Sequence, residues 1–192
     1  WFETPFKVSS SLDENSAAVV MDFSVRGLFD LVRMRILDAE RHLVAKKDLL
    51  YGNFILGKAS CLLDVSNIHR WNGLKDPYLY TVEARIISGD SVLDTLKTDI
   101  GFRTFNMDPK KGFLLNGVSY PLHGVSKHQD REGKGNAISR KDMEEDIELI
   151  LECGANAVRL AHYQHDKYVY DLCDRKGLVV WAEIPYMSRH ME

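Results

Sequence analysis

The stretch NAVRLAHYQHDKYVYDLCDRKGLVVWAEIP, residues 156–185, holds two short apolar runs on either side of a helical pattern. NAVRLA (156–161) predicts a buried strand, and LVVWAEIP (178–185) predicts another, nearly continuous in apolar residues as buried parallel strands are. Between them, a helix over about 166–176 buries apolar residues at helical spacing and ends at a glycine: Val169, Leu172, Cys173 and Gly177. Strand, helix and strand with short connections predict a βαβ unit.

The preceding segment extends this pattern toward the N-terminus. FLLNGVSYPLHGV (113–125) predicts two strands around an Asn116-Gly117 turn, a strong hairpin signal. After a polar, glycine-bearing loop, Ser139 is the expected N-cap of a helix that ends near Gly154. One face of this helix is apolar: Met143, Ile147, Ile150 and Leu151.

Strand, helix, strand, helix, strand is compatible with the start of a (β/α)8 barrel or with an open doubly wound sheet. The segment GVSKHQDREGKG after the first strand (124–135) is not the GxGxxG turn that an open nucleotide-binding sheet favours. Polar side chains follow each strand instead, as at the C-terminal face of a barrel. We therefore expect the barrel.

The sequence pattern of residues 1 to about 103 predicts strands and no helices. AAVVMDFSVR (17–26), LVRMRIL (31–37) and YTVEARI (80–86) alternate apolar and polar residues with period two, the pattern of half-buried strands. Turn signals such as Asn72-Gly73 separate these runs. Six or seven short strands in about 100 residues predict a two-sheet sandwich of immunoglobulin type.

Composition excludes several classes of protein. The net charge of −3, with both signs mixed along the chain, provides no basic face for nucleic acid. No apolar run approaches the roughly 18 residues of a membrane span, and residues 1–20 lack the features of a signal peptide. Cys61, Cys153 and Cys173 are expected to be buried, reduced thiols. Because the chain starts at Trp1, we expect an excerpt, and the compartment stays open.

Polar residues follow all three strands of the predicted barrel segment. They are Lys127, His128 and Asp130 after the first strand, Arg159, His162 and Tyr163 after the second, and Glu183 at the end of the third. The C-terminal ends of barrel strands converge on one mouth, so a joint site is expected there. The structural alternatives are a satisfied histidine and a simple Arg159–Glu183 pair between neighbouring strands.

Two kinds of chemistry are compatible with these residues. His128, His162, His165 and Glu183 could form a metal site, but no HxH or HExxH pair provides ligand spacing, so metal-dependent hydrolysis is a weak alternative. Glu183 and Asp130 are the available carboxylates, and glycoside hydrolysis uses two. The sequence does not identify these two as such a pair.

The same stretch resembles the signature of glycoside hydrolase family 2, the β-galactosidase and β-glucuronidase group. The matching positions are Asn156, Arg159, Ala161, His162, Tyr163, Asp174, Gly177 and Leu178 to Trp181. Leu160 and Gln164 depart from that signature, as Ser126 and Gln129 depart from the family's usual Asn and Glu in the lead into its barrel. Pro77, Leu79, Tyr80 and Gly101-Phe102-Arg103 resemble the close of the family's immunoglobulin-like domain.

The resemblance implies a multidomain β plus α/β chain. Residues 1–104 would form an immunoglobulin-like β-sandwich, and residues 105–192 the first three strands of a (β/α)8 TIM barrel. It also implies a retaining β-glycosidase that needs no cofactor and acts on a β-linked carbohydrate. No metal ligand is assigned.

Both catalytic glutamates of the family are expected beyond Glu192, so the 192 residues alone are expected to be inactive. The sugar-binding residues implied are His128, Asp130, Arg159, His162 and Tyr163, together with Glu183, whose implied role is to orient the others. GKG (133–135) resembles β-glucuronidases, whereas AEIPYMSRH (182–190) is closer to galactosidase-like members, so neither sugar is chosen.

A partial barrel is expected to expose an apolar face and self-associate. The alternative function is a non-catalytic carbohydrate-binding or domain-docking module.

Overall fold

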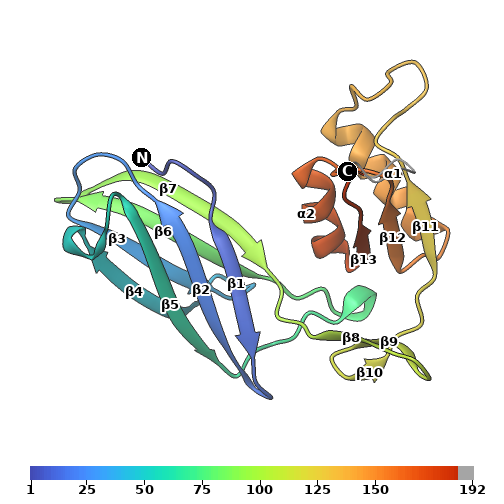
Figure 1. Cartoon of the computed structure of the whole chain (residues 1–192), viewed down its shortest axis with the longest axis horizontal. Helices are drawn as coiled ribbons and strands as arrows, with labels where there is room; N and C mark the ends of the chain where they lie inside the picture. Colours follow the sequence, from blue (N-terminus) through green and yellow to red (C-terminus); the bar gives the residue numbers. More distant parts are fainter. Residues whose placement is uncertain (186–192) are drawn as a thin grey trace, which may run out of the picture. The chain divides into compact units, whose positions relative to one another are not determined.

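The computed structural model describes residues 1–185, and the end of the AEIPYMSRH segment lies outside that range. The chain forms two compact units (Figure 1). The first unit contains Trp1–Arg70 and Tyr78–Arg103. The second contains Trp71–Pro77 and the chain from Thr104 onward.

The first unit is a sandwich of two antiparallel sheets, as predicted. One sheet has the order β1-β2-β5 and the other β4-β3-β6-β7. The strands are β1 (Lys7–Leu12), β2 (Ser16–Ser24), β3 (Leu31–Leu37), β4 (Leu43–Leu50), β5 (Lys58–Ser66), β6 (Tyr80–Ser88) and β7 (Ser91–Ile100).

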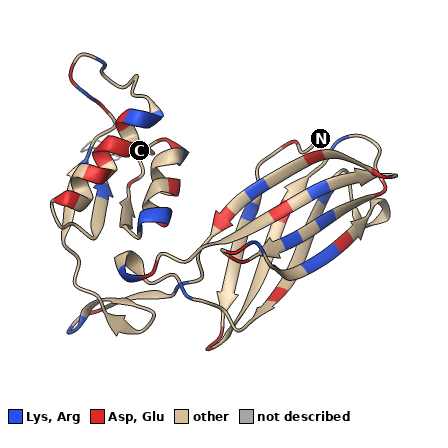
Figure 2. Cartoon of the chain, turned by 180° about the vertical axis from the view of Figure 1, so that it is seen from behind, with Lys and Arg blue, Asp and Glu red and all other residues tan. Residues whose placement is uncertain are grey.

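The period-two pattern produces the core of the sandwich. Alternate residues of β3 are fully buried, namely Val32, Met34 and Ile36, and Met34 pairs with Ala84 of β6. Because successive side chains of a strand point to opposite faces, Arg33 and Arg35 lie on the other face of the sheet. Figure 2 shows both signs of charge along the strands of this unit.

A small antiparallel sheet with the order β10-β9-β8 opens the main part of the second unit. Its strands are β8 (Phe105–Asp108), β9 (Gly112–Leu115) and β10 (Val118–Ser119). The predicted turn is confirmed, because Asn116 (φ 52°) and Gly117 (φ 80°) both have positive φ, as a two-residue hairpin turn of type I′ requires.

The predicted second strand of this hairpin was too long, because β10 ends at Ser119 and a separate strand begins at Gly124. Pro121 lies between the two strands and has no N–H with which to continue a ladder. The side chain of Asn156 binds this connection instead: its Nδ2 donates to the Pro121 carbonyl (2.8 Å), and its Oδ1 accepts from the His123 amide (2.7 Å).

Three parallel strands and two helices follow this small sheet in the described residues, as predicted. The sheet has the order β11-β12-β13, with β11 (Gly124–Lys127), β12 (Ala157–Leu160) and β13 (Val179–Ala182). The helices are α1 (Arg140–Glu152) and α2 (Lys167–Lys176). Ser139 caps α1 in a reciprocal capping box with Asp142, and Gly177 ends α2 at φ 81°.

Residues 71–77 belong to the second unit although they lie between β5 and β6 in the sequence. The Trp71 side chain is buried, and its indole Nε1 donates to the Asp174 carbonyl (2.8 Å). The backbone passes so close to the end of α2 that a Cβ on Gly177 would lie 2.4 Å from the Gly73 carbonyl oxygen. Only glycine fits at position 177, because the backbone there has a positive φ and because a Cβ would collide with the Gly73 carbonyl.

The three cysteines are free, but they are not all buried. Burial raises the pKa of Cys61, and it raises the pKa of Cys173 to about 12. The prediction of burial is wrong for Cys153, which is the exposed C-cap of α1. Over residues 1–185, none of the helices has the length and apolar content to cross a membrane.

Candidate functional site

Arg159 and Glu183 meet where two parallel strands end. Arg159 lies on β12 beside Ser126 of β11 and Trp181 of β13, and Glu183 immediately follows β13. The Arg159 Nε donates to Glu183 Oε1 at 2.7 Å, and its Nη1 lies 3.4 Å from the Ser126 hydroxyl. The Arg159–Glu183 pair, which the sequence offered as the structural alternative to a site, is therefore present.

His162 completes a three-residue cluster with this pair. Its Nδ1 lies 2.9 Å from Glu183 Oε2 and 3.2 Å from Arg159 Nη2. The Glu183 carboxylate can only accept a hydrogen bond. The shorter contact, to Glu183, therefore fits the His162 tautomer that carries its proton on Nδ1 and donates it to Glu183. We call Arg159, His162 and Glu183 the strand-end cluster. The peptide bond between Ala161 and His162 is cis.

The electrostatics of the strand-end cluster keep Glu183 ionised. Desolvation acts to raise the pKa of Glu183 and is the largest single effect. The hydrogen bonds and charges of Arg159 and His162 together outweigh it, and the pKa lies below its usual value. At neutral pH this group is therefore a carboxylate, able to accept further hydrogen bonds.

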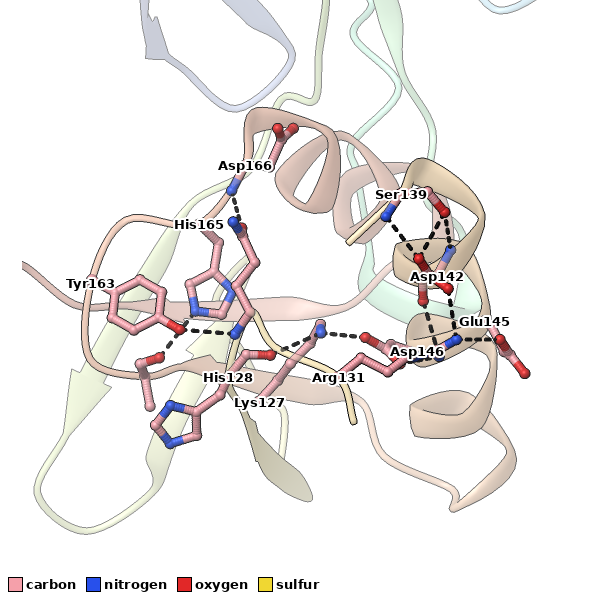
Figure 3. Close-up of polar contacts among 12 residues, drawn as sticks. Lys127, His128, Arg131, Ser139, Asp142, Glu145, Asp146, Tyr163, His165 and Asp166 are labelled. Atoms are coloured by element: carbon pink, nitrogen blue, oxygen red, sulfur yellow. Dashed lines mark hydrogen bonds and ion pairs between the residues drawn. The ribbon is translucent and has the colours of Figure 1, made fainter. Parts of the chain in front are cut away.

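Two further predicted site residues lie against the strand-end cluster. The His128 and His162 rings are 5.3 Å apart in an edge-on arrangement. The Tyr163 hydroxyl accepts from the Gln129 amide at 3.0 Å, and its ring stacks on that of His165, with centroids 5.1 Å apart (Figure 3). His128 and Tyr163 thus lie beside the cluster, and Tyr163 joins the β12 exit to the β11 exit.

The other two residues predicted at the β11 exit behave differently. Asp130 is exposed, and within residues 1–185 its side chain makes no hydrogen bond or ion pair. Lys127 is the last residue of β11, but its side chain is buried and its Nζ bonds Asp146 of α1 at 2.5 Å (Figure 3). Since strand side chains alternate between faces, Lys127 points to the helix side, whereas its neighbour Ser126 meets Arg159.

Three residues of the site were noted in the sequence only as departures from a family pattern. Ser126 contacts Arg159, and Gln164 Nε2 donates to the Glu183 carbonyl at 2.8 Å. Gln129 Oε1 accepts from the Asp166 amide at 2.5 Å. Ser126 lies near the end of β11, and Gln129 and Gln164 follow β11 and β12, so their positions near strand ends were the signal that could have identified them.

The metal-site alternative receives no support from the geometry. His165 is buried, and its Nε2 lies 3.1 Å from the Ala161 carbonyl, with burial lowering its pKa. In the described part of the chain, one group has ligand atoms close enough to hold a metal ion, and it lies in the first unit: Asp38, Glu40 and His42. The four residues of the alternative do not form such a group.

The fold and the strand-end cluster define a β-sandwich followed by parallel β/α units with charged residues at the strand ends, and comparison with known families identifies the class of these domains. The model of glycosyl hydrolases family 2 matches residues 6–103. The model of the TIM barrel domain of the same family matches residues 108–192. The chain belongs to glycosyl hydrolase family 2.

Relatives of the chain include both β-glucuronidases and β-galactosidases. A beta-glucuronidase of Bacteroides fragilis is 47% identical over 118 residues, which cover 62% of this chain and 17% of the relative. The human beta-glucuronidase is 33% identical over 187 residues, covering 93% of this chain and 27% of its own. A beta-galactosidase of Bacteroides ovatus is 34% identical over 121 residues, which cover 63% of this chain and 14% of the relative.

A solved structure with a similar fold has a name of the same kind. The crystal structure of a putative beta-galactosidase from Bacteroides fragilis superposes with a TM-score of 0.84 at 33% identity, over 94% of this chain and 28% of that one. The chain spans between about a seventh and three tenths of the relatives and structures described here.

Proposed function

We propose that the chain provides the glycone-binding rim of a retaining β-glycosidase. The strand-end cluster carries this proposal, because a guanidinium, an imidazole and an ionised carboxylate meet at the carboxyl ends of parallel strands. In barrel enzymes that edge is where substrates bind. The rim would comprise His128, Asp130, Arg159, His162, Tyr163 and Glu183.

In this proposal β11, β12 and β13 are the first three strands of a (β/α)8 barrel. Residues 1–104 would be the immunoglobulin-like domain, and residues 105–192 the start of the catalytic barrel. The parallel order of the three strands and the helices between them support the assignment.

The three residues of the strand-end cluster have specific tasks in this proposal. Glu183 accepts hydrogen bonds from sugar hydroxyls, and its contacts with Arg159 and His162 hold the carboxylate in place. With Nδ1 occupied by Glu183, His162 presents Nε2 to the ligand. Hydrogen bonds of this kind to the sugar ring strengthen as the oxocarbenium-like transition state forms.

The two catalytic carboxylates of the retaining mechanism would lie beyond Glu192. Retaining enzymes hold them about 5–5.5 Å apart. Glu183 is already paired with Arg159 and His162, and Asp130 belongs to another strand exit, so neither is proposed as a catalyst. The names of the relatives support a β-galactoside or a β-glucuronide as substrate.

The first test extends the chain past Glu192 in its parent gene. We expect the extended protein to hydrolyse at least one aryl β-glycoside from a panel including galactoside and glucuronide, and residues 1–192 alone to hydrolyse none. The most rapidly cleaved member would identify the sugar. A folded extended protein that cleaves none would support a non-catalytic carbohydrate-binding or docking module.

We also propose that the 192-residue chain self-associates through its barrel segment. A groove of about 420 Å³ lies on the β11-β12-β13 sheet and is lined mainly by apolar residues, including Phe105, Val125 and Trp181, together with Ser126 and Arg159. Trp181 is 64% exposed on β13, which is an edge strand. Unpaired strand edges and large exposed apolar patches favour association.

Light scattering at micromolar concentration tests this expectation. We expect a mass above that of the 22.0 kDa monomer, reduced toward the monomer by Trp181→Lys. Leu28→Lys is the matched control, because Leu28 is 84% exposed but lies in the first unit. A clean monomer for the unaltered chain would contradict self-association.

A further inference from the structure

An ion-pair cluster connects the loop after β11 to helix α1. Its acidic residues lie on α1, where Asp142 is one turn before the adjacent Glu145 and Asp146. Its cations come from the end of β11 and the following loop, namely Lys127, Arg131 and Lys134. Figure 3 shows the side chains of Lys127 and Arg131 converging on the helix from the loop side.

Arg131 makes the most contacts in this cluster. Its Nη1 donates to Asp142 Oδ1 at 2.9 Å and to Glu145 Oε2 at 2.7 Å, and its Nη2 donates to Asp146 Oδ1 at 2.7 Å. The planar fork of a guanidinium can bind several carboxylates at once, which an ammonium group cannot do with the same geometry. Arg131 is therefore the residue that joins the loop to three positions of α1.

Two acidic residues of the cluster, Asp142 and Asp146, have lowered pKa values and are largely buried. The pKa of Asp142 lies well below its usual value, first because Lys134 donates to it and then because Ser139 does. Desolvation acts to raise the pKa of Asp146, but Lys127 and Arg131 together lower it. The side chains of Lys127 and Asp142 are each 7% exposed. The Lys127–Asp146 pair is therefore largely shielded from water, whereas Asp142 pairs with the more exposed Arg131 and Lys134.

The backbone from 127 to 131 is held on both sides of Asp130. Lys127 Nζ donates to the His128 carbonyl at 3.0 Å, and the Gln129 amide donates to the Tyr163 hydroxyl at 3.0 Å. On the other side, the Arg131 amide and carbonyl both bond Gly135, at 3.1 and 2.9 Å.

Because the Asp130 side chain has no partner within residues 1–185, its position depends on these backbone anchors. Gln129 and Arg131 are the immediate ones. Loss of either anchor would move the carboxylate without removing it.

We propose that Arg131 is a positioning residue that holds the Asp130 carboxylate at the glycone-binding rim by fixing the loop after β11 to α1. The inference rests on the proposed function and deepens it, since it adds a residue that acts on the same site without touching substrate. A displacement of about 1 Å in a substrate-positioning group lowers rates by about 100-fold. A purely structural Arg131 would affect stability alone.

The test compares kcat/KM for four variants of the extended enzyme, each with its thermal midpoint. Arg131→Met is expected to lower kcat/KM by about 30- to 100-fold, and Asp130→Ala by a similar factor. The double variant should lose no more than about threefold beyond Asp130→Ala, since residues that act as a unit are not additive. Arg131→Lys should keep an intermediate activity, because it keeps the charge without the fork.

Lys134→Met is the matched control. The Lys134 side chain also pairs with Asp142, at 2.7 and 2.8 Å, but not with Glu145 or Asp146. Lys134 lies inside the turn that Arg131 and Gly135 close, and its own contact with that turn is a backbone one, from its amide to the Arg131 carbonyl (3.0 Å), which the substitution keeps. The Lys134→Met substitution removes one cation that contacts the same face of α1. It should keep kcat/KM within about threefold of the unaltered enzyme.

Three results would overturn the positioning role. They are equal effects of Arg131→Met and Lys134→Met, additive losses in the double variant, and full activity of Asp130→Ala. If Arg131→Met does not fold, Arg131→Lys and the same cycle with Asp130→Ala decide the question. An unaltered extended enzyme that cleaves no glycoside would refute the proposed function itself, which is a separate result.

Discussion

Replacing Arg159 by alanine in the extended enzyme is expected to lower kcat/KM by about 100- to 1000-fold, which corresponds to about 3–4 kcal/mol of lost transition-state stabilisation. The change removes the donor at 2.7 Å from Glu183 Oε1 and the cation beside His162. Glu183 then keeps its desolvation but loses its main counter-charge. A disordered carboxylate would no longer fix the sugar ring.

The pH profile gives a second measurement of the same change. Arg159 lowers the pKa of Glu183, so its removal should raise that pKa, and the carboxylate should become protonated at a higher pH. The acidic limb of the kcat/KM profile is therefore expected to move to higher pH in Arg159→Ala. An unaltered limb would argue that Glu183 does not need to be ionised.

Arg175→Ala is the control for Arg159→Ala. Arg175 lies in the last turn of α2, with its guanidinium carbon 5.5 Å from the centroid of the Tyr168 ring and away from the strand-end cluster. Its removal should leave kcat/KM within about threefold, since cation–π contacts at exposed sites contribute only about 0.5–1 kcal/mol to stability. If Arg159→Ala kept more than a third of the activity, the strand-end cluster would have no role in sugar binding.

Replacing Glu83 by glutamine is expected to destabilise the sandwich by about 3 kcal/mol at neutral pH. The Glu83 side chain on β6 is 1% exposed. It pairs with Arg35 of β3, with Arg85 (Nε to Oε1, 2.7 Å) and with Lys97 of β7 (Nζ to Oε2, 3.1 Å). A neutral side chain would leave three cations crowded together without their common anion.

The pH dependence of this loss follows from the pKa of Glu83. Desolvation raises this pKa, but hydrogen bonds from Arg35, Arg85 and Lys97 outweigh it and bring it to about 2, from 4.5. A lowered pKa in the folded state stabilises the fold above about pH 4.5, and this contribution is lost as the pH falls through about 2. The difference in unfolding free energy between the two proteins should therefore be constant from pH 6 to 8 and shrink below pH 4.5.

Urea unfolding followed by far-UV circular dichroism measures this difference. Asp48→Asn is the matched control on the same sheet, because Asp48 pairs with Arg33 at 2.8 Å but is 29% exposed. An exposed pair of this kind contributes under about 1 kcal/mol. Equal losses for Glu83→Gln and Asp48→Asn would contradict a special role for the buried carboxylate.

Local patterns were enough to predict most elements of the fold. The alternation in β3, the N-cap at Ser139 and the Asn116-Gly117 turn each depend on residues within a few positions of one another. The grouping of Arg159, His162 and Glu183 also followed from the sequence, because parallel strands place their carboxyl ends at one edge.

Tertiary structure alone decided several other features, because they depend on contacts between distant residues. Lys127 was expected at the site, but the alternation of β11 and the position of α1 direct it to Asp146. In the period-two pattern of β6, Glu83 falls on the polar face of the sheet. Its side chain is nevertheless buried, because the long side chains of neighbouring strands cover it.

The segment from Trp71 to Pro77 lies in the second unit because Trp71 is buried against the end of α2, more than 100 positions along the chain. Hydrophobic period and caps are properties of a short stretch of chain, and the sequence by itself determined them. Which strand end faces which helix, and which charge is shielded from water, are properties of the packed whole, and only the tertiary structure decided them.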